Sequence, residues 1–301
     1  MPPISRAQAD LMLLVAAMVW GSAFYFQKQA MLHIGPMLFV GLRGVISSIA
    51  LLPLALREQK RTKGIDKALV RLSIWGGLTF LAGGALQQIG LVSATVINGS
   101  LLTALYVVIV PLLAWLLFRT PPRRATWLYV AVAFAGSWLL GGGTITGFSA
   151  GDWVIALSTI AWAAHILITQ AAGRQARPMT YTCIQFAIVG VIGLAIAAMA
   201  EPISFSAIAM TWHNIAFVAL VSGAMGFALM AVALQHTPAA DATIIMSTET
   251  LFAVLVGYTF LHERLSPAGW LGGALILAAV ILMQLEQYLG RRRLPSPITL
   301  R

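Results

Sequence analysis

Charged residues are scarce in this chain, and their scarcity limits the class of protein. Only 9% of the 301 residues are charged, whereas 59% are hydrophobic and the mean hydropathy is +0.88. A soluble domain has about 25% charged residues, which cover its surface in water. This composition excludes a soluble globular protein and predicts an integral membrane protein surrounded by lipid.

Cysteine and the short motifs of enzymes are also missing. The one cysteine, Cys183, excludes a disulfide framework within the chain and a cysteine-based metal site. There is no Gly-Lys-Ser/Thr phosphate loop, and His262-Glu263 lacks the second His of a zinc motif. We therefore expect no enzymatic activity, no cofactor and no metal. A channel is disfavoured because no repeated filter sequence is visible, and a binding or scaffold role without transport stays open.

Ten apolar runs follow one another along the chain. A helix needs about 20 apolar residues to cross ~30 Å of hydrocarbon, and the first run, from Leu11 to Met31, has no charge before Lys28. The alternative for the first run is a cleaved signal peptide, but such a peptide would have no reason to share its sequence pattern with residues 155–172. We predict an all-α integral membrane protein with ten transmembrane helices, the fourth of them interrupted by Pro111. The helices are expected at residues 11–31, 36–56, 72–92, 95–118, 125–140, 152–172, 179–200, 214–235, 242–261 and 268–289.

Lysine and arginine outnumber the acids by 19 to 9, and their distribution predicts the orientation of the chain. All of them except Lys28, Arg43 and Arg264 fall in segments that ten crossings place on one side of the membrane. Loops rich in Lys and Arg stay in the cytoplasm, so both termini are predicted to be cytoplasmic. Because these residues are spread over short loops between apolar runs, they do not indicate nucleic-acid binding.

The second half of the chain loosely repeats the first. The pairs 142 residues apart are Trp20 and Trp162, Pro36-Met37 and Pro178-Met179, and Arg43 and Gln185, and Trp127 and Trp270 follow at 143. Internal duplication in a membrane protein is typical of transporters. Because each copy has five helices, the second copy must be inserted upside down. We predict two inverted five-helix repeats, at residues 9–143 and 149–289, around a central cavity, and a basic cytoplasmic tail at 290–301.

Several stretches resemble a known family. The runs 101–113 and 247–257, the latter followed by Leu-His-Glu-Arg-Leu-Ser at 261–266, are similar to the fourth and ninth helices of EamA-type proteins in the drug/metabolite transporter superfamily. Trp20-Gly21-Ser22 and Arg43 also match positions where that family often has Trp-Gly-Ser and Arg. The chain departs from the family pattern at two places. Residues 119–121 are Arg-Thr-Pro, although the equivalent residues 263–265 of the second half are Glu-Arg-Leu, and Thr250 occupies a position where many relatives have proline. The resemblance covers residues 9–289.

The resemblance implies a transporter of the bacterial inner membrane with ten helices in two inverted repeats. It implies export of amino acids or other small metabolites, and one branch of the family exports aromatic amino acids. Drugs are the alternative substrates. A small-molecule substrate and the lipid bilayer are therefore the expected partners. Gly269 and Gly273 form a pair of small residues one helical turn apart, which is compatible with a monomer or with a weak homodimer.

Aromatic residues near the middle of helices are the first candidates for substrate binding. Trp20 and Trp162 lie away from the interface belt where tryptophan usually gathers, so they either pack in the core or line the cavity as a symmetric pair. His165 shares a helix face with Trp162 and is either a hydrogen-bonded core residue or a proton carrier. Phe24 and Tyr106 are further aromatic candidates.

Polar residues inside apolar runs are the second group of candidates. A carboxylate in the ninth run, Glu249, costs several kcal/mol unless it is paired, protonated or wetted, so it is a candidate for proton coupling or for contact with a substrate amine. Arg43 either stabilises the structure or receives a substrate carboxylate. Gln87 and Asn98 either join helices by hydrogen bonds or face the cavity.

Overall fold

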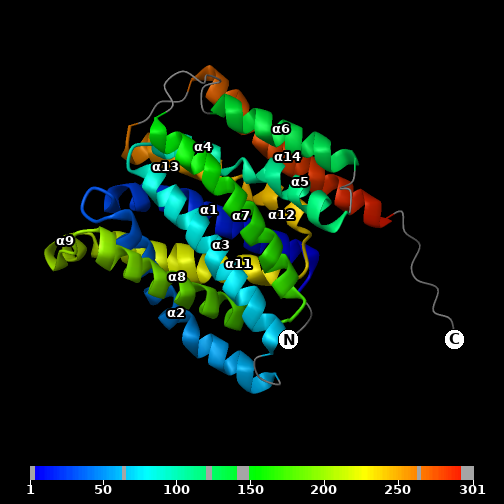
Figure 1. Cartoon of the computed structure of the whole chain (residues 1–301). Coiled ribbons are helices and arrows are strands. Elements are labelled where there is room, and N and C mark those ends of the chain that lie inside the picture. Colours follow the sequence, from blue (N-terminus) through cyan, green and yellow to red (C-terminus); the bar gives the residue numbers. More distant parts are fainter. Residues whose placement is uncertain (1–3, 63–65, 120–123, 141–148, 263–265, 293–301) are drawn as a thin grey trace.

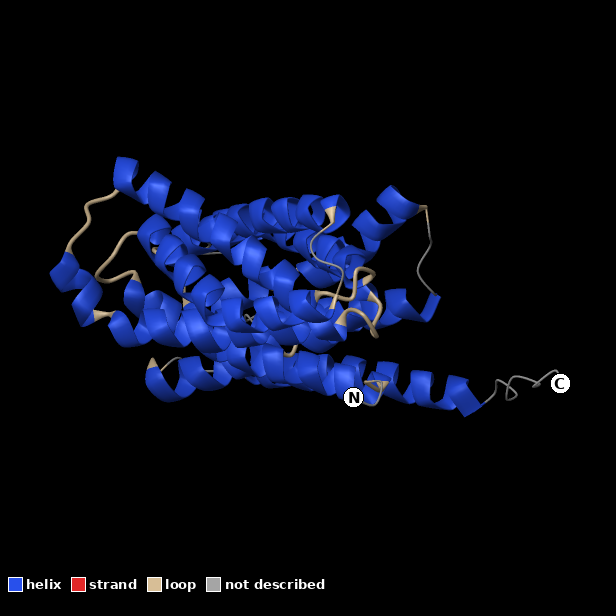
Figure 2. Ribbon diagram, turned by 90° about the horizontal axis from the view of Figure 1, so that it is seen from below, coloured by secondary structure: helices blue, strands red, loops and turns tan. Residues whose placement is uncertain are grey.

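The computed structural model describes residues 4–62, 66–119, 124–140, 149–262 and 266–292. Within these ranges the secondary structure is entirely helical, and most helices run roughly along one direction (Figures 1 and 2). The elements are α1 (Arg6–Ala30), α2 (Pro36–Arg61), α3 (Lys67–Leu91), α4 (Val96–Thr103), α5 (Tyr106–Phe118), α6 (Arg124–Leu140), α7 (Ala150–Gly173), α8 (Pro178–Ala200), α9 (Phe205–Met210), α10 (Trp212–Ala216), the π-helix η1 (Phe217–Gly226), α11 (Phe227–Ala233), α12 (Ala239–Met246), α13 (Glu249–Phe260) and α14 (Pro267–Arg292).

Eight helical stretches in the described residues are long and apolar enough to cross a membrane. They are α1, α2, α3, α4 with α5, α7, α8, α10 to α11, and α12 with α13. The fifth and tenth predicted spans correspond to α6, with 17 residues, and to α14, in which the described apolar stretch covers Pro267–Ala279. The protein is thus an all-helical membrane protein, and the count of ten crossings stays a prediction. The repeat junction at 141–148 and the tail beyond residue 292 lie outside the described residues.

Three of the predicted spans are not continuous α-helices. The fourth is divided between Thr103 and Tyr106, and the ninth between Met246 and Glu249. The expectation that Pro111 interrupts the fourth run is wrong, because this proline lies inside α5. Both divisions fall at equivalent positions of the two halves, so they belong to the repeated architecture rather than to a proline. In the eighth span the middle ten residues form the π-helix η1.

Local sequence determines where the main helices begin. Ser5 and Ser149 each cap a helix by accepting the backbone N–H three residues later, and the side chains of Gln8 and Asp152 complete the two capping boxes. Pro36 and Pro178 occupy the first position of α2 and α8, where the missing N–H has no partner to lose. The halves of the chain therefore start their first two helices with the same devices, at nearly the same interval.

The helices α2 and α8 form a closely packed antiparallel pair. Gly41 lies against Gly193, and Gly44 against Gly190, so closely that an added Cβ atom at any of these positions would lie within 3.0 Å of the opposite backbone. Glycine is required here because only its bare backbone permits this approach. The carboxylate of Glu201, after α8, accepts the first free N–H groups of α2.

A similar contact recurs at the other end of the α2–α8 pair, where the carboxylate of Glu58 accepts the first free N–H groups of α8. Glu58 and Glu201 occupy equivalent positions of the two halves, and each binds the start of a helix from the other half. The bonds are Met37 N to Glu201 Oε1 at 2.8 Å, Leu38 N to Glu201 Oε2 at 2.8 Å, Met179 N to Glu58 Oε1 at 3.3 Å and Thr180 N to Glu58 Oε2 at 2.7 Å. Because helix N-termini carry unpaired donors and a partial positive charge, both ends of the pair are fixed by ionic hydrogen bonds.

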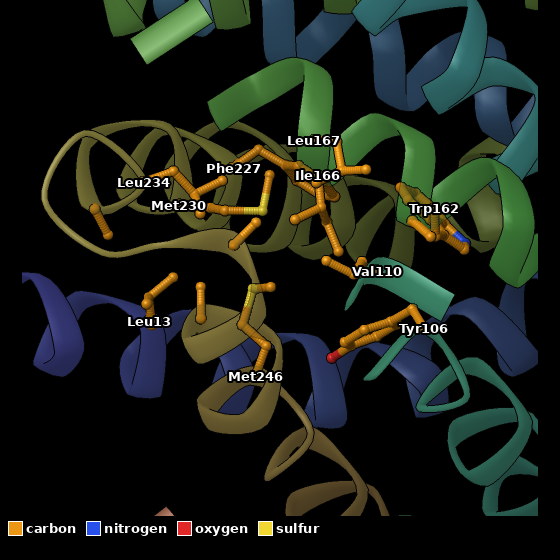
Figure 3. Close-up of a cluster of buried hydrophobic side chains, with 14 of the residues drawn as sticks. Leu13, Tyr106, Val110, Trp162, Ile166, Leu167, Phe227, Met230, Leu234 and Met246 are labelled. Atoms are coloured by element: carbon orange, nitrogen blue, oxygen red, sulfur yellow. The ribbon is translucent and has the colours of Figure 1, made fainter. Parts of the chain in front are cut away.

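The core of the bundle lies where helices from both halves meet. Figure 3 shows side chains of α1, α5, α7, α11 and α12 directed toward one another around Tyr106, Trp162 and Phe227. The cluster mixes aliphatic, aromatic and methionine side chains, and it borders the cavity described next.

Candidate functional site

A cavity opens at the centre of the bundle between the two halves of the chain. The empty space between its atoms amounts to about 530 Å³, of which the centre of a water molecule can occupy about 60 Å³. The cavity is therefore narrow in this state. It is lined by Trp20, Phe24, Gln27, Arg43, Gln87, Thr103, Tyr106, Trp162, His165, Ile166, Ser222, Phe227, Met230, Met246 and Glu249.

The structure brings eight of the nine predicted site residues together around this cavity. They are Trp20, Phe24, Arg43, Gln87, Tyr106, Trp162, His165 and Glu249. Asn98 is the exception, because it lies in the first turn of α4 and is not among the lining residues. The proximity of the eight residues gives their predicted roles a common location, although the roles themselves stay predictions.

The cavity contains one basic and one acidic side chain, one from each half. Arg43 is 3% exposed, its Cζ atom lies 4.8 Å from the centre of the Phe80 ring, and its Nε atom has no hydrogen-bond partner. Glu249 is also 3% exposed, and its Oε1 atom has no partner. A buried charge without complete pairing costs several kcal/mol. The two groups are thus able to bind a solute that carries both charges.

The broken helices explain how the acid reaches the cavity. Glu249 is the first residue of α13, and Tyr106, at the equivalent position of the other half, is the first residue of α5. Side chains at such a break point from the helix start toward the space between the repeats, and a carboxylate there is favoured by the helix dipole. The Tyr106 hydroxyl and the Glu249 carboxyl group interact electrostatically.

The two tryptophans occupy equivalent places but differ in their hydrogen bonding. Each indole ring covers a glycine, Gly226 for Trp20 and Gly83 for Trp162, and a Cβ atom on either glycine would lie within about 3.0 Å of the ring. Trp20 Nε1 donates to the carbonyl oxygen of Ser222 at 3.1 Å, whereas Trp162 Nε1 is buried without a partner. Of the two equivalent indole rings, only that of Trp162 therefore has an N–H group without a hydrogen-bond partner.

The π-helix accounts for the bond that Trp20 makes. A π-helix shifts the backbone hydrogen-bond pattern and often occurs at functional sites. Within η1, the carbonyl oxygen of Ser222 accepts from Trp20, and that of Ala219 accepts from Ser47 Oγ of α2 at 2.7 Å. The equivalent segment of the first half lies in α3, which is an ordinary α-helix. The π-helix thus ties η1 to α1 and α2 beside the cavity.

Phe227 is the aromatic centre of the cavity wall. Its ring centroid lies 4.8 Å from that of Trp20, 4.7 Å from that of Phe80, and 6.0 Å from that of Trp162, with which it is stacked. Aromatic faces spaced in this way suit a flat or apolar ligand group. The sequence offered no signal for Phe227, because it follows a uniformly apolar run.

His165 is completely buried beside Trp162. Its Nε2 atom lies 2.9 Å from Oε1 of Gln185, and its Nδ1 atom has no partner. Gln185 stands where the first half has Arg43, so the repeat has exchanged a charge for an amide that orients a histidine. The imidazole is thus held as a polar group of the cavity wall.

Several lining residues were not predicted from the sequence. Gln27 lies on the same α1 face as Trp20 and Phe24, so helical spacing could have identified it, and its Oε1 atom has no partner. Thr103 accepts a hydrogen bond from Gln87 Nε2 at 2.9 Å. The others are Ile166, Ser222, Phe227, Met230 and Met246. Among the described residues no group of three or more His, Cys, Asp or Glu could hold a metal ion.

An all-helical membrane protein with a polar and aromatic cavity between two related halves has the architecture of a solute transporter. The EamA-like transporter family matches residues 7–142 and again residues 149–285, and the chain belongs to this family. It is a membrane transporter.

The relatives agree with this class. An uncharacterized transporter of Archaeoglobus fulgidus is 28% identical over 289 residues, which cover 94% of this chain and 88% of the relative. The uncharacterized transporter YwfM of Bacillus subtilis is 26% identical and is matched over 91% of this chain and 93% of its own. The uncharacterized inner membrane transporter YedA of Escherichia coli K12 is 25% identical, with 90% and 89% covered. A crystal structure superposes with a TM-score of 0.76 at 16% identity, covering 96% of this chain and 99% of that one, which shows the fold alone.

Proposed function

We propose that the protein is a secondary transporter that exports amino acids, aromatic ones among them, or related small metabolites across the bacterial inner membrane. The observation that carries this proposal is the presence of one basic side chain, Arg43, and one acidic side chain, Glu249, in the same buried cavity with an aromatic wall. A zwitterion with an apolar or aromatic side chain has the complementary groups.

Each part of such a substrate has a matching group in the cavity. The guanidinium of Arg43 would bind the α-carboxylate, and the carboxylate of Glu249 would bind the α-ammonium group. The side chain would lie among Phe227, Trp20 and Trp162, whose rings surround the space. The narrowness of the cavity indicates a state in which the two repeats are close together, so the substrate would enter after they separate.

We propose alternating access by rocking of two inverted repeats, with ten crossings and both termini in the cytoplasm. An ionic network lies at the end of the bundle with most Lys and Arg, and in this proposal it holds that end closed. Arg6 pairs with Asp10 at 2.8 Å and with Asp241 at 3.1 Å, and Thr237 donates to Asp10 at 2.9 Å. This network joins the start of α1 to the start of α12. Loading an export substrate from the cytoplasm would require it to open.

Counterflow in liposomes tests the proposal. Vesicles that contain the purified protein are loaded with an unlabelled amino acid, and the uptake of the labelled one is measured for all twenty in turn. We expect uptake of at least one apolar or aromatic amino acid, and competition among substrates that share a zwitterion. No uptake of any amino acid by folded protein would contradict the amino-acid proposal and would leave other metabolites, drugs or a role without transport.

A charge-neutralising variant separates binding from folding. Arg43→Gln introduces the residue that the second half has at the equivalent position, so the cavity keeps a polar side chain of similar reach. If Arg43 binds the substrate carboxylate, this variant should lose uptake of the zwitterion while it keeps the elution profile and helicity of the wild type. Unchanged uptake would show that Arg43 has a structural role only.

A further inference from the structure

The first half of α3 presents an exposed stripe that the transport cavity does not use. The stripe has two basic residues near its start and four large apolar ones, and together with Asp66 they line a surface groove in which the centre of a water molecule can occupy about 470 Å³. Its members are Lys67, Val70, Arg71, Ile74, Trp75 and Leu78, all exposed. Their spacing places them on one face of the helix.

The opposite face of α3 is fixed against α8. A Cβ atom added to Gly76 would lie 2.3 Å from the Tyr181 hydroxyl, and one added to Gly77 would lie 2.9 Å from the Ile188 side chain. The helix therefore cannot turn its apolar stripe inward without losing this contact. Trp75, with 56% of its surface exposed, remains on the outside of the bundle.

The two cations of the stripe have no counterion in the described chain. Asp66, the one acid in the groove, accepts the backbone N–H of Leu69 at 2.7 Å and pairs with Arg177 at 2.5 Å. The Leu69 N–H and the Arg177 guanidinium hold the pKa of Asp66 below its usual value, so its carboxylate is ionised and balanced by Arg177. Lys67 and Arg71 make no hydrogen bond or ion pair with any described residue, and residues 63–65 contain no acid.

We propose that this stripe binds an anionic phospholipid. Lys67 and Arg71, one helical turn apart, would hold the phosphate, and the apolar residues that follow would contact an acyl chain. Basic residues at a membrane surface attract anionic headgroups, and tryptophan is enriched at the depth where headgroup and acyl chain meet. The apolar part of the groove is continuous with the charged part, and a soluble anion would make no favourable contact with it. The occupant that matches both parts is a lipid.

Quenching of Trp75 by brominated lipid tests this proposal. The full chain is reconstituted in phosphatidylcholine vesicles with a graded fraction of brominated phosphatidylglycerol, and in parallel with brominated phosphatidylcholine. Because the chain has nine tryptophans, the signal of Trp75 is taken as the difference between the wild type and Trp75→Phe. We expect this signal to show a clear preference for phosphatidylglycerol. Equal quenching by the two lipids would overturn the proposal.

Neutralising the two cations should remove the preference. A basic residue near an anionic surface strengthens binding by about fivefold, so Lys67→Gln should lower the preference by about that factor, and the double variant with Arg71→Gln by up to about thirtyfold. Each variant is compared with its own Trp75→Phe derivative, and circular dichroism confirms that it is helical. An unchanged preference in the double variant would refute the site.

A matched control removes the same charge elsewhere. Arg57 and Lys60 are exposed on α2 at the same end of the bundle and lie outside the groove. Arg57→Gln with Lys60→Gln should leave the preference unchanged, and an equal loss would mean that overall charge, not this stripe, attracts the lipid. Added inorganic phosphate should not relieve the quenching, because it cannot occupy the apolar part of the groove, and relief would overturn the lipid assignment.

Discussion

Removing either of the two carboxylate caps should weaken the bundle by a similar amount. Glu201 and Glu58 each accept two backbone N–H groups at the start of a helix from the other half of the chain. A hydrogen bond to a charged group contributes about 1.5–3 kcal/mol, and a negative charge at a helix N-terminus adds about 0.3–2 kcal/mol. Glutamine retains one acceptor oxygen and loses the charge. We therefore expect Glu201→Gln and Glu58→Gln each to lower the free energy of unfolding by about 2 kcal/mol.

The measurement is equilibrium unfolding of the purified protein in detergent by titration with sodium dodecyl sulfate. The two caps lie at opposite ends of the α2–α8 pair and share no partner, so the double variant should lose the sum of the two single losses, about 4 kcal/mol. Helicity before titration serves as the control for folding. A loss below about 0.5 kcal/mol in either single variant would refute the reasoning, because ionic hydrogen bonds of this kind are not worth so little. A loss at one end only would refute the equivalence of the caps.

Three further predictions concern the cavity. Trp20→Phe should lower the free energy of unfolding by about 1–3 kcal/mol because it leaves the Ser222 carbonyl oxygen without its donor. Trp162→Phe removes a donor that has no partner and should lower it by less than about 1 kcal/mol. Thermal unfolding of the two variants side by side checks this contrast. Gly21→Ala places a Cβ atom 2.3 Å from the Glu249 carbonyl oxygen and should destabilise the contact of α1 with α13 by about 1–3 kcal/mol, measured by the same method. Glu249→Gln should lose uptake of the zwitterion in liposomes if Glu249 binds the substrate ammonium group, whereas it should keep uptake and lose its pH dependence if Glu249 couples protons. Retained uptake with an unchanged pH profile would exclude this residue from both roles.

Much of the cavity could be predicted from the sequence because polar residues are costly in lipid. Within a long apolar run, Glu249, Arg43 and Gln87 stand out, since each needs a partner or a wet surface. Trp20 and Trp162 stand out for a different reason, which is that they recur at the interval of the repeat. These two signals are independent of each other, and the structure shows that they converge on one space.

The remaining features depend on backbone geometry that apolar sequence does not encode. The π-helix η1 and the break before Glu249 occur in segments whose side chains differ little from those of a continuous helix. Phe227 directly follows η1 and Thr103 is the last residue of α4, and both line the cavity. Pro111 gave a misleading signal, since it lies inside α5 and the second half breaks at the equivalent position without a proline.

The position of Asn98 outside the cavity becomes intelligible when the two halves are compared. Its equivalent in the second half is Asp241, which pairs with Arg6 at the other end of the bundle. Asn98 thus occupies the position equivalent to a member of the Arg6 ion network rather than to a cavity residue.

The two ends of the bundle therefore resist opening by different physical means. The α2–α8 pair is held by a carboxylate at both ends, so a rocking motion of the repeats would leave it in place and separate other helices around it. At the end with Arg6, separation has to break a partly buried ion network, whose strength depends on pairing and on exclusion of salt. At the opposite end Lys28 of α1 donates to the backbone carbonyl oxygens of Leu91, Val92 and Ala94 at 2.8, 3.1 and 2.8 Å. If the repeats rock as proposed, Arg6 and its two acids contribute to the equilibrium between the two open states, and the rate at which the protein opens at that end should increase with ionic strength.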